Sequence, residues 1–332
     1  MGKFTNMMVA GALAMMAFSS CSEEKKGYVI DGQITDVKEG MMYLKKYVDK
    51  TFVEVDSAVI VDGKFKFEGV ASEALAHGLT TRKESNRPQV FFLDNDAMQV
   101  TLNESGKELA ITGSAANDIF LRNAKITRSK GYSLDSLIAA HPASPVAAYF
   151  VVKDFAYKLD LESMKAVRAL FDASLNGTSY IQQIESMIAR MEKVRVGSVA
   201  PDFTLPHVDG NPVSLSSFRG KYVLVDFWAA WCPDCRKENP NIVAAWEKYK
   251  DKNFAVLGVS LDRTREQWLA AIEKDKLAWT QVSDLKYWNS EAAVLYCIRW
   301  IPMSFLIDPE GKIVAIGLEG EELHNKLEEL LK

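Results

Sequence analysis

The chain has 332 residues, of which 48% are hydrophobic and 25% are charged. This length exceeds one ordinary domain, and the composition excludes collagen-like, low-complexity and wholly disordered chains. The formal net charge is −4. Because non-specific nucleic-acid binding needs a basic surface, no nucleic-acid partner is expected. Four cysteines are too few for a disulfide-built scaffold, and the four histidines have no metal-ligand spacing. We therefore expect a multi-domain globular protein without a bound metal.

Residues 1–20 have the pattern of a signal peptide. A lysine precedes the apolar run from Met7 to Phe18, which is too short to span a bilayer. Two serines and then Cys21 follow, which resembles the lipobox of bacterial lipoproteins, although Phe18 stands where those proteins usually have leucine. The resemblance implies a lipid on Cys21, with residues 21–26 as the polar tether of a membrane-anchored protein. Secretion without a lipid is the alternative.

Residues 27–114 show the two-residue alternation of β-strands. Val53 and Val55 alternate with acidic residues, which predicts a half-buried strand. Asp62 and Gly63 then predict a hairpin turn, because both turn positions favour positive φ. Further strands are expected at Tyr28–Ile34, Met41–Val48, Gln89–Leu93 and Met98–Leu102. The spacing predicts a small β-sandwich or open barrel, which we interpret as a binding or packing module without chemistry of its own.

Residues 115–196 change to helical periodicity and are expected to form a helical connector. Apolar residues recur at helical spacing in two runs: Leu161, Met164, Val167, Leu170 and Phe171, then Ile181, Ile184, Ile188 and Met191. This stripe predicts amphipathic helices whose apolar face is core. A helix lying on a membrane is the alternative, but the charges are mixed rather than basic.

Residues 223–228 form an apolar run typical of a central strand, and Cys232 and Cys235 follow where a helix should begin. A C-x-x-C at such a junction predicts a redox dithiol, because the first helical turn can bring both sulfurs within disulfide distance. The helix N-terminus also stabilises a thiolate on the first cysteine. Half of a zinc site and a structural disulfide are the alternatives, although no second cysteine or histidine pair accompanies the motif.

The sequence from Leu224 to Cys235, LVDFWAAWCPDC, closely resembles the active-site segment of thioredoxins. Residues 200–205 and 215–221 resemble the start of the redoxin domain shared by peroxiredoxins and TlpA/ResA-type proteins, and residues 300–308 resemble its proline loop. The resemblance covers residues 197–332 and implies an α/β thioredoxin-like fold, with a central mixed sheet flanked by helices. The order of the parts also resembles an exported subfamily with an uncharacterised β-rich N-terminal domain.

The resemblance implies catalytic roles around the dithiol. Cys232 would be the exposed nucleophile and Cys235 the more buried resolving cysteine. Asp226 occupies the position of the buried acid that transfers a proton to the resolving cysteine. Glu238 stands where TlpA/ResA-type proteins have a functional glutamate. Which acid carries the proton stays open, and a solvated helix charge is the alternative for Glu238.

The resemblance also implies a substrate-binding surface formed by Trp231, Pro233, Asp234, Ile301 and Pro302. Pro302 would follow a cis peptide bond, leaving the Ile301 backbone to pair with an extended substrate strand. Trp231 would shape the rim of the site. The negative charge of Asp234 should raise the pKa of the first cysteine and favour a reducing protein.

Cys297 is the remaining cysteine of the C-terminal part. Its apolar surroundings predict a buried core thiol. A third redox cysteine is the alternative.

We interpret the chain as a thiol-disulfide oxidoreductase of the cell envelope, a lipoprotein facing the periplasm from the inner or outer membrane or exposed at the surface. It would reduce disulfides of exported proteins, be recharged by a membrane thiol donor, and need no cofactor beyond the Cys232–Cys235 disulfide. A thiol peroxidase of the redoxin family is an alternative, although no Thr-x-x-Cys pattern precedes a helix. A surface binding module with an accessory redox domain is the non-enzymatic alternative.

Overall fold

The computed structural model describes residues 27–48, 51–127 and 129–332. The expected signal peptide, tether and Cys21 lie outside these residues. The chain forms two compact units that divide between Ala115 and Ala116. No helix in the described ranges is both long and apolar enough to cross a membrane.

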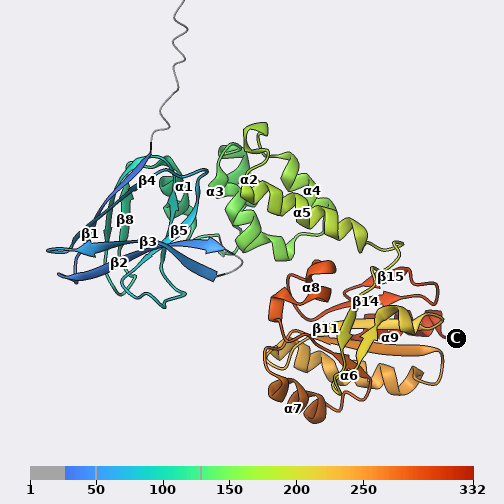
Figure 1. The fold of residues 1–332 in the computed structure, drawn as a ribbon. Coiled ribbons are helices and arrows are strands. Elements are labelled where there is room, and N and C mark those ends of the chain that lie inside the picture. The colour runs from blue at the N-terminus through green and yellow to red at the C-terminus, as the bar shows by residue number, and fades with distance from the viewer. Residues whose placement is uncertain (1–26, 49–50, 128) are drawn as a thin grey trace, which may run out of the picture. The chain divides into compact units, whose positions relative to one another are not determined.

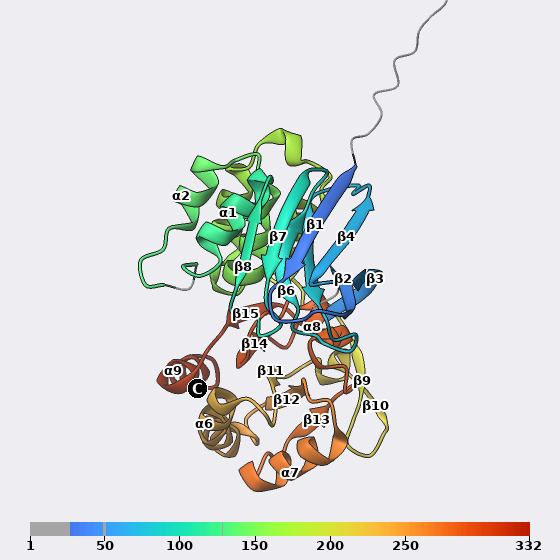
Figure 2. The ribbon, with the colours of Figure 1, turned by 90° about the vertical axis from the view of Figure 1, so that its left-hand side faces the viewer.

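The first unit contains two four-stranded sheets, which agrees with the expected β-rich N-terminal region. Its strands are β1 (Tyr28–Ile34), β2 (Gly40–Val48), β3 (Thr51–Ile60), β4 (Lys64–Gly69), β5 (Leu75–Thr80), β6 (Gln89–Leu93), β7 (Ala97–Leu102) and β8 (Leu109–Thr112). The sheet orders are β4-β1-β7-β8 and β3-β2-β5-β6, and Figure 2 shows the first of these sheets. Buried and exposed residues alternate along β1, β4 and β7, so this sheet has one buried face.

The predicted hairpin turn is confirmed and carries the chain from one sheet to the other. Asp62 and Gly63 have φ values of 50° and 77°, and Val61 forms an isolated bridge with Lys64. Both central residues thus adopt the positive φ that this turn requires.

The expectation that β3 is half-buried is wrong. Val53 is 42% exposed and Val55 is 51% exposed. The reason is position, because β3 lies at the edge of its sheet and pairs only with β2 within it. Strands β5 and β8 were not predicted from the sequence. All but the last residue of β5 are buried, so the strand lacks the alternation by which half-buried strands are recognised.

The second unit begins with helices. They are α1 (Ala115–Asn123, whose first residue falls in the first unit), α2 (Leu134–Ala140), α3 (Pro145–Phe150), α4 (Leu161–Ala169) and α5 (Ser179–Lys193), with a π-helical turn at Val151–Phe155 and a 3-10 turn at Ala156–Lys158. Met164 and Ile184 are fully buried, as expected of the apolar stripe. Leu170, expected in the same stripe, is instead 44% exposed. Because α4 ends at Ala169, Leu170 lies beyond the helix, and the helical periodicity no longer directs its side chain toward the core.

The rest of the second unit is the expected mixed sheet with flanking helices (Figure 1). Its elements are β9 (Thr204–Pro206), β10 (Pro212–Ser214), β11 (Tyr222–Trp228), α6 (Pro233–Tyr249), β12 (Phe254–Ser260), α7 (Arg265–Asp275), β13 (Thr280–Val282), α8 (Glu291–Leu295), β14 (Met303–Ile307), β15 (Ile313–Ile316) and α9 (Gly320–Leu330), with 3-10 turns at Leu215–Phe218 and Tyr287–Asn289. The five-stranded sheet has the order β13-β12-β11-β14-β15. β11 is central, parallel to β12 and antiparallel to β14. The C-terminal ends of β11 and β12 therefore lie beside the loop that leads into β14.

Candidate active site

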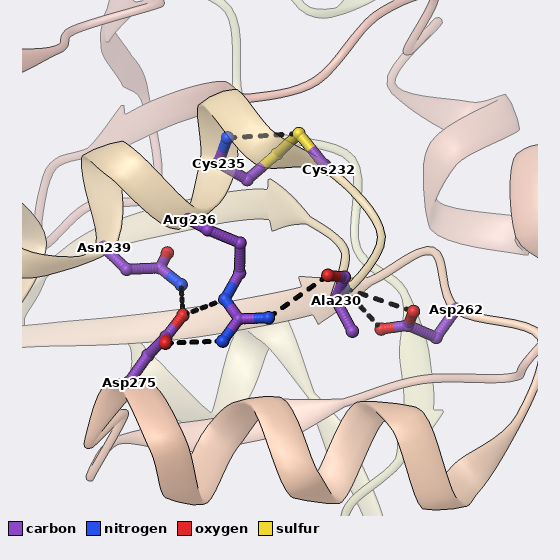
Figure 3. Close-up of polar contacts among 7 residues, drawn as sticks. All are labelled: Ala230, Cys232, Cys235, Arg236, Asn239, Asp262 and Asp275. Carbon is purple, nitrogen blue, oxygen red and sulfur yellow. Dashed lines mark hydrogen bonds and ion pairs between the residues drawn. A yellow bond between two sulfur atoms is a disulfide. The ribbon is translucent and has the colours of Figure 1, made fainter.

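Cys232 lies at the N-cap of α6, directly after the loop that follows β11. It forms a disulfide with Cys235 across a Cα–Cα distance of 5.3 Å. Its Sγ also accepts the backbone N–H of Cys235 at 3.1 Å (Figure 3). The sulfur thus occupies the place of an N-cap oxygen, where unpaired N–H groups and the helix dipole stabilise negative charge. This geometry favours a thiolate when the disulfide is reduced.

The nucleophile expected to be exposed is buried in this disulfide form. Cys232 is 4% exposed and Cys235 is 1% exposed, so the first cysteine is only marginally more accessible. The proline loop accounts for part of this cover, because the carbonyl oxygen of Ile301 lies 3.7 Å from Cys232 Sγ.

The expected substrate-binding residues lie in two segments, one at the start of α6 and one directly before β14. The Ile301–Pro302 peptide bond is cis, and both residues are half-buried directly before β14. Pro233 and Asp234 are exposed at the start of α6, and Trp231 is 40% exposed.

Trp231 belongs to an aromatic cluster that the sequence analysis did not anticipate. Its ring centroid lies 5.1 Å from that of Tyr287 and 6.0 Å from that of Trp288. The guanidinium of Arg263 stands 4.0 Å from the Tyr287 centroid. Trp231, the residue before Cys232, therefore belongs to an aromatic cluster that has a cation over one of its rings.

Asp226 is buried in the middle of the central strand. It is 2% exposed and pairs with Gly258 of β12 and Ser304 of β14. Burial, with the added charges of Glu238 and Glu319, raises the pKa of Asp226 to about 7. The carboxyl group can therefore take up and release a proton near neutral pH.

Glu238 is a hydrogen-bonded acceptor rather than a freely solvated charge. It accepts the side-chain N–H of Asn241 at 2.6 Å and the backbone N–H of Gly320 at 2.9 Å. Its acidic neighbour is Glu319, the N-cap of α9. Burial and the charge of Glu238 are the main causes that raise the pKa of Glu319.

Asp234, between the two cysteines, forms an ion pair with Lys237 at 3.1 Å. The two side chains are 75% and 79% exposed. Water and the lysine both weaken the field that this carboxylate exerts on its surroundings.

Cys297 is half-buried rather than a core thiol, so the core expectation is wrong. Its φ is 54°, and its Sγ lies 3.8 Å from the carbonyl oxygen of Met187 in α5. Nearby, Arg299 donates to the carbonyl oxygens of Ala156 at 2.5 Å and Leu159 at 2.9 Å. The segment before the proline loop therefore contacts the helices of its own unit, which is why Cys297 lies outside the sheet's core.

Among the described residues, no cluster of three or more histidine, cysteine or acidic side chains could hold a metal ion.

Comparison with known proteins identifies the family. Residues 196–316 match the AhpC/TSA family, and residues 28–120 match a domain of unknown function (DUF4369). The thiol-disulfide oxidoreductase ResA of Bacillus cereus is 30% identical over 173 residues, which cover 51% of this chain and 98% of ResA. The chain belongs to the ResA family of thiol-disulfide oxidoreductases. It is an oxidoreductase enzyme of the thioredoxin-like type.

A second ResA and two solved structures are also similar to part of this chain. ResA of Oceanobacillus iheyensis is 31% identical over 48% of this chain and 85% of its own length. A thioredoxin domain from Bacteroides vulgatus is 48% identical over 42% of this chain and 99% of its own, with a TM-score of 0.40. A C-terminal domain from Bacteroides thetaiotaomicron is 40% identical over 42% of this chain and 97% of its own, with a TM-score of 0.41.

Two acidic residues of this ResA-family site, Glu319 and Asp262, were not predicted from the sequence. Glu319 left no sequence signal, because only the fold brings it near Glu238. Asp262 could have been found, since it follows β12, and the C-terminal ends of parallel neighbouring strands meet at one edge of a sheet. Asp262 is fully buried and accepts the N–H of Ala230 in the loop before Cys232 (Figure 3).

Proposed function

We propose that Cys232 and Cys235 reduce disulfides of exported proteins by thiol-disulfide exchange. The observation that carries this proposal is the position of Cys232 Sγ at the N-cap of α6, where it accepts the N–H of Cys235. A thiolate at that position is stabilised and can attack a disulfide.

The proposed reaction has two displacements. In the first, the Cys232 thiolate attacks one sulfur of the substrate disulfide, that bond breaks, and the other substrate sulfur leaves as a thiolate. In the second, Cys235 loses its proton and attacks Cys232 Sγ, which releases the second substrate thiol. The substrate gains two electrons, and the Cys232–Cys235 dithiol is oxidised to the disulfide seen here.

Asp226 is the proposed proton acceptor for Cys235. A carboxyl group with a pKa of about 7 is partly ionised near neutral pH and can take a proton from a thiol. Burial, together with the negative charges of Glu238 and Glu319, holds that pKa high. Trp231, Pro233, Asp234, Ile301 and Pro302 are the proposed contacts of the substrate segment.

The proposed location is the cell envelope. The signal-peptide pattern of residues 1–20 and the lipobox-like Cys21 support a lipoprotein that faces the periplasm. Such a protein would meet disulfide-containing exported proteins and be returned to the dithiol by a thiol donor in the membrane. The proposed reaction needs no cofactor beyond the disulfide itself.

The test is substrate trapping with the full mature chain. Cys235→Ser removes the resolving thiol, so mixed disulfides with envelope proteins should accumulate on Cys232. Cys232→Ser is the matched control, because it keeps one cysteine of the pair but removes the nucleophile. Trapping by Cys235→Ser and none by Cys232→Ser supports the proposal.

Two outcomes contradict it. Rapid consumption of hydrogen peroxide by the wild-type protein, without trapped proteins, would favour a thiol peroxidase. Neither trapping nor peroxide consumption, with firm ligand binding by residues 27–114, would favour a binding module with an accessory redox domain.

A further inference from the structure

Ala230, two residues before Cys232, is held on both sides of its backbone. Its N–H donates to the two carboxylate oxygens of Asp262, at 3.2 Å and 3.0 Å. Its carbonyl oxygen accepts Nη1 of Arg236 at 3.2 Å. Figure 3 shows Asp262 and Arg236 on opposite sides of Ala230. Both backbone groups of this loop residue are therefore bound by charged side chains.

Asp262 is itself fixed in place. It has no exposed surface, and the Ser260 hydroxyl donates to its carboxylate at 2.8 Å. The same hydroxyl oxygen accepts the Asp262 backbone N–H at 3.1 Å. A buried carboxylate is costly unless its hydrogen bonds are satisfied, and here they are directed at the active-site loop.

Arg236 is fixed from the other side. It forms an ion pair with Asp275 at the end of α7, with Nη2 and Oδ1 2.6 Å apart. The side chain of Asn239 donates to the same carboxylate at 2.6 Å. Although burial opposes it, these hydrogen bonds keep the pKa of Asp275 below its ordinary value, so the ion pair is retained at neutral pH. Side chains from the end of β12, the start of α6 and the end of α7 thus fix the two peptide groups on either side of the Ala230 Cα.

We infer that Asp262 and Arg236 are positioning residues for the exchange reaction, which hold Ala230 so that Cys232 Sγ stays at the N-cap of α6. This inference rests on the proposed role of Cys232 as the nucleophile. A displacement of about 1 Å at a reacting atom can cost about a hundredfold in rate. The network would therefore affect the thiolate and the exchange rate, beyond any contribution to folding.

The test compares Asp262→Ala with Asp262→Asn in the full mature chain. Both variants remove the buried charge, but asparagine keeps an oxygen that can accept the Ala230 N–H. Ser283→Ala is the matched control, because Ser283 is buried and donates at 2.9 Å to the carbonyl of Ser260 without touching Ala230. The readouts are the pH dependence of Cys232 alkylation in the reduced protein and the rate of exchange with glutathione disulfide.

Asp262→Ala should exchange about tenfold more slowly than Asp262→Asn and show a higher apparent pKa for Cys232. Ser283→Ala should lower the melting temperature without moving either readout. Equal rates and equal Cys232 pKa values for the alanine and asparagine variants would overturn the inference. If wild-type protein does not exchange at all, the proposed function fails instead.

Arg236→Lys provides a second variant if Asp262→Ala does not fold. Lysine can keep a charge beside Asp275, but it lacks the planar fork that reaches Asp275 and the Ala230 carbonyl together. We expect slower exchange and a raised Cys232 pKa. If Arg236→Lys has the wild-type exchange rate and the wild-type Cys232 pKa, Arg236 is not a positioning residue.

Discussion

Glu238, on α6, accepts the backbone N–H of Gly320 at 2.9 Å. This hydrogen bond joins α6 to the beginning of α9, so Glu319, the residue before Gly320, is brought near Glu238. The charges of Glu238 and Glu319 both act on the buried Asp226. The fold therefore gathers three acidic side chains from separate parts of the chain.

Removing either outer charge should lower the pKa of Asp226. Glu238→Gln should have the larger effect and Glu319→Gln the smaller, in the order of their influence on Asp226. The measurement is an NMR titration of the Asp226 carboxyl group in each variant. Asp226→Asn identifies its resonance by loss of the signal. An Asp226 pKa that stays at about 7 in both variants would show that burial alone sets it.

Asp226→Asn should change how stability depends on pH. The folded wild type keeps a proton on Asp226 between pH 3.8 and about 7, whereas the unfolded chain has released it. The wild-type free energy of unfolding therefore loses about 1.4 kcal/mol per pH unit from this group as pH rises through that window, or roughly 4 kcal/mol in all. The variant lacks this loss, so its free energy of unfolding should rise relative to that of wild type as pH increases.

Denaturant unfolding at several pH values between about 4 and 8 measures this difference in unfolding free energy. This range roughly spans the pKa values of Asp226 in the unfolded and folded chain. Asp251→Asn is the control, because that aspartate is exposed. If the difference in unfolding free energy between Asp226→Asn and wild type does not vary with pH, the pKa of Asp226 is not raised in the folded protein.

Asp234→Asn and Lys237→Gln should move the Cys232 pKa in opposite directions. Loss of the carboxylate should lower it, and loss of the lysine should raise it, because the two charges oppose each other beside the thiolate. Each shift should be below about one unit, since exposed ion pairs interact weakly. Alkylation rates against pH give both values. Shifts of the same sign would refute this electrostatic account.

Cys297 should react slowly with iodoacetamide in the folded, reduced protein. It is half-buried and lies against the Met187 carbonyl, whereas Cys232 gains the stabilisation of a helix N-terminus. Mass spectrometry of timed samples gives the labelling rate at each cysteine. Cys297→Ser should leave exchange with glutathione disulfide unchanged. If Cys297 is labelled as fast as Cys232, the alternative that Cys297 is a third redox cysteine is supported instead.

Local sequence patterns predicted the elements that carry the dithiol, because each pattern lies within a few consecutive residues. The apolar run of β11 and the C-x-x-C after it place Cys232 at a helix start. The contacts of Glu319 depend on where α9 begins, which no short pattern encodes, whereas the place of Asp262 follows once β11 and β12 are known to be parallel neighbours. The exposure of β3 escaped prediction for a related reason, since alternation does not tell an edge strand from an inner one.

The contacts of Arg299 extend beyond the part of the chain that matches the AhpC/TSA family. The AhpC/TSA match begins at residue 196, but the guanidinium of Arg299 is bonded to carbonyl groups of Ala156 and Leu159. A fragment starting at residue 196 would leave this cation without those acceptors, two residues from Ile301. The boundary of the family match therefore separates Arg299 from the two carbonyl groups that it contacts.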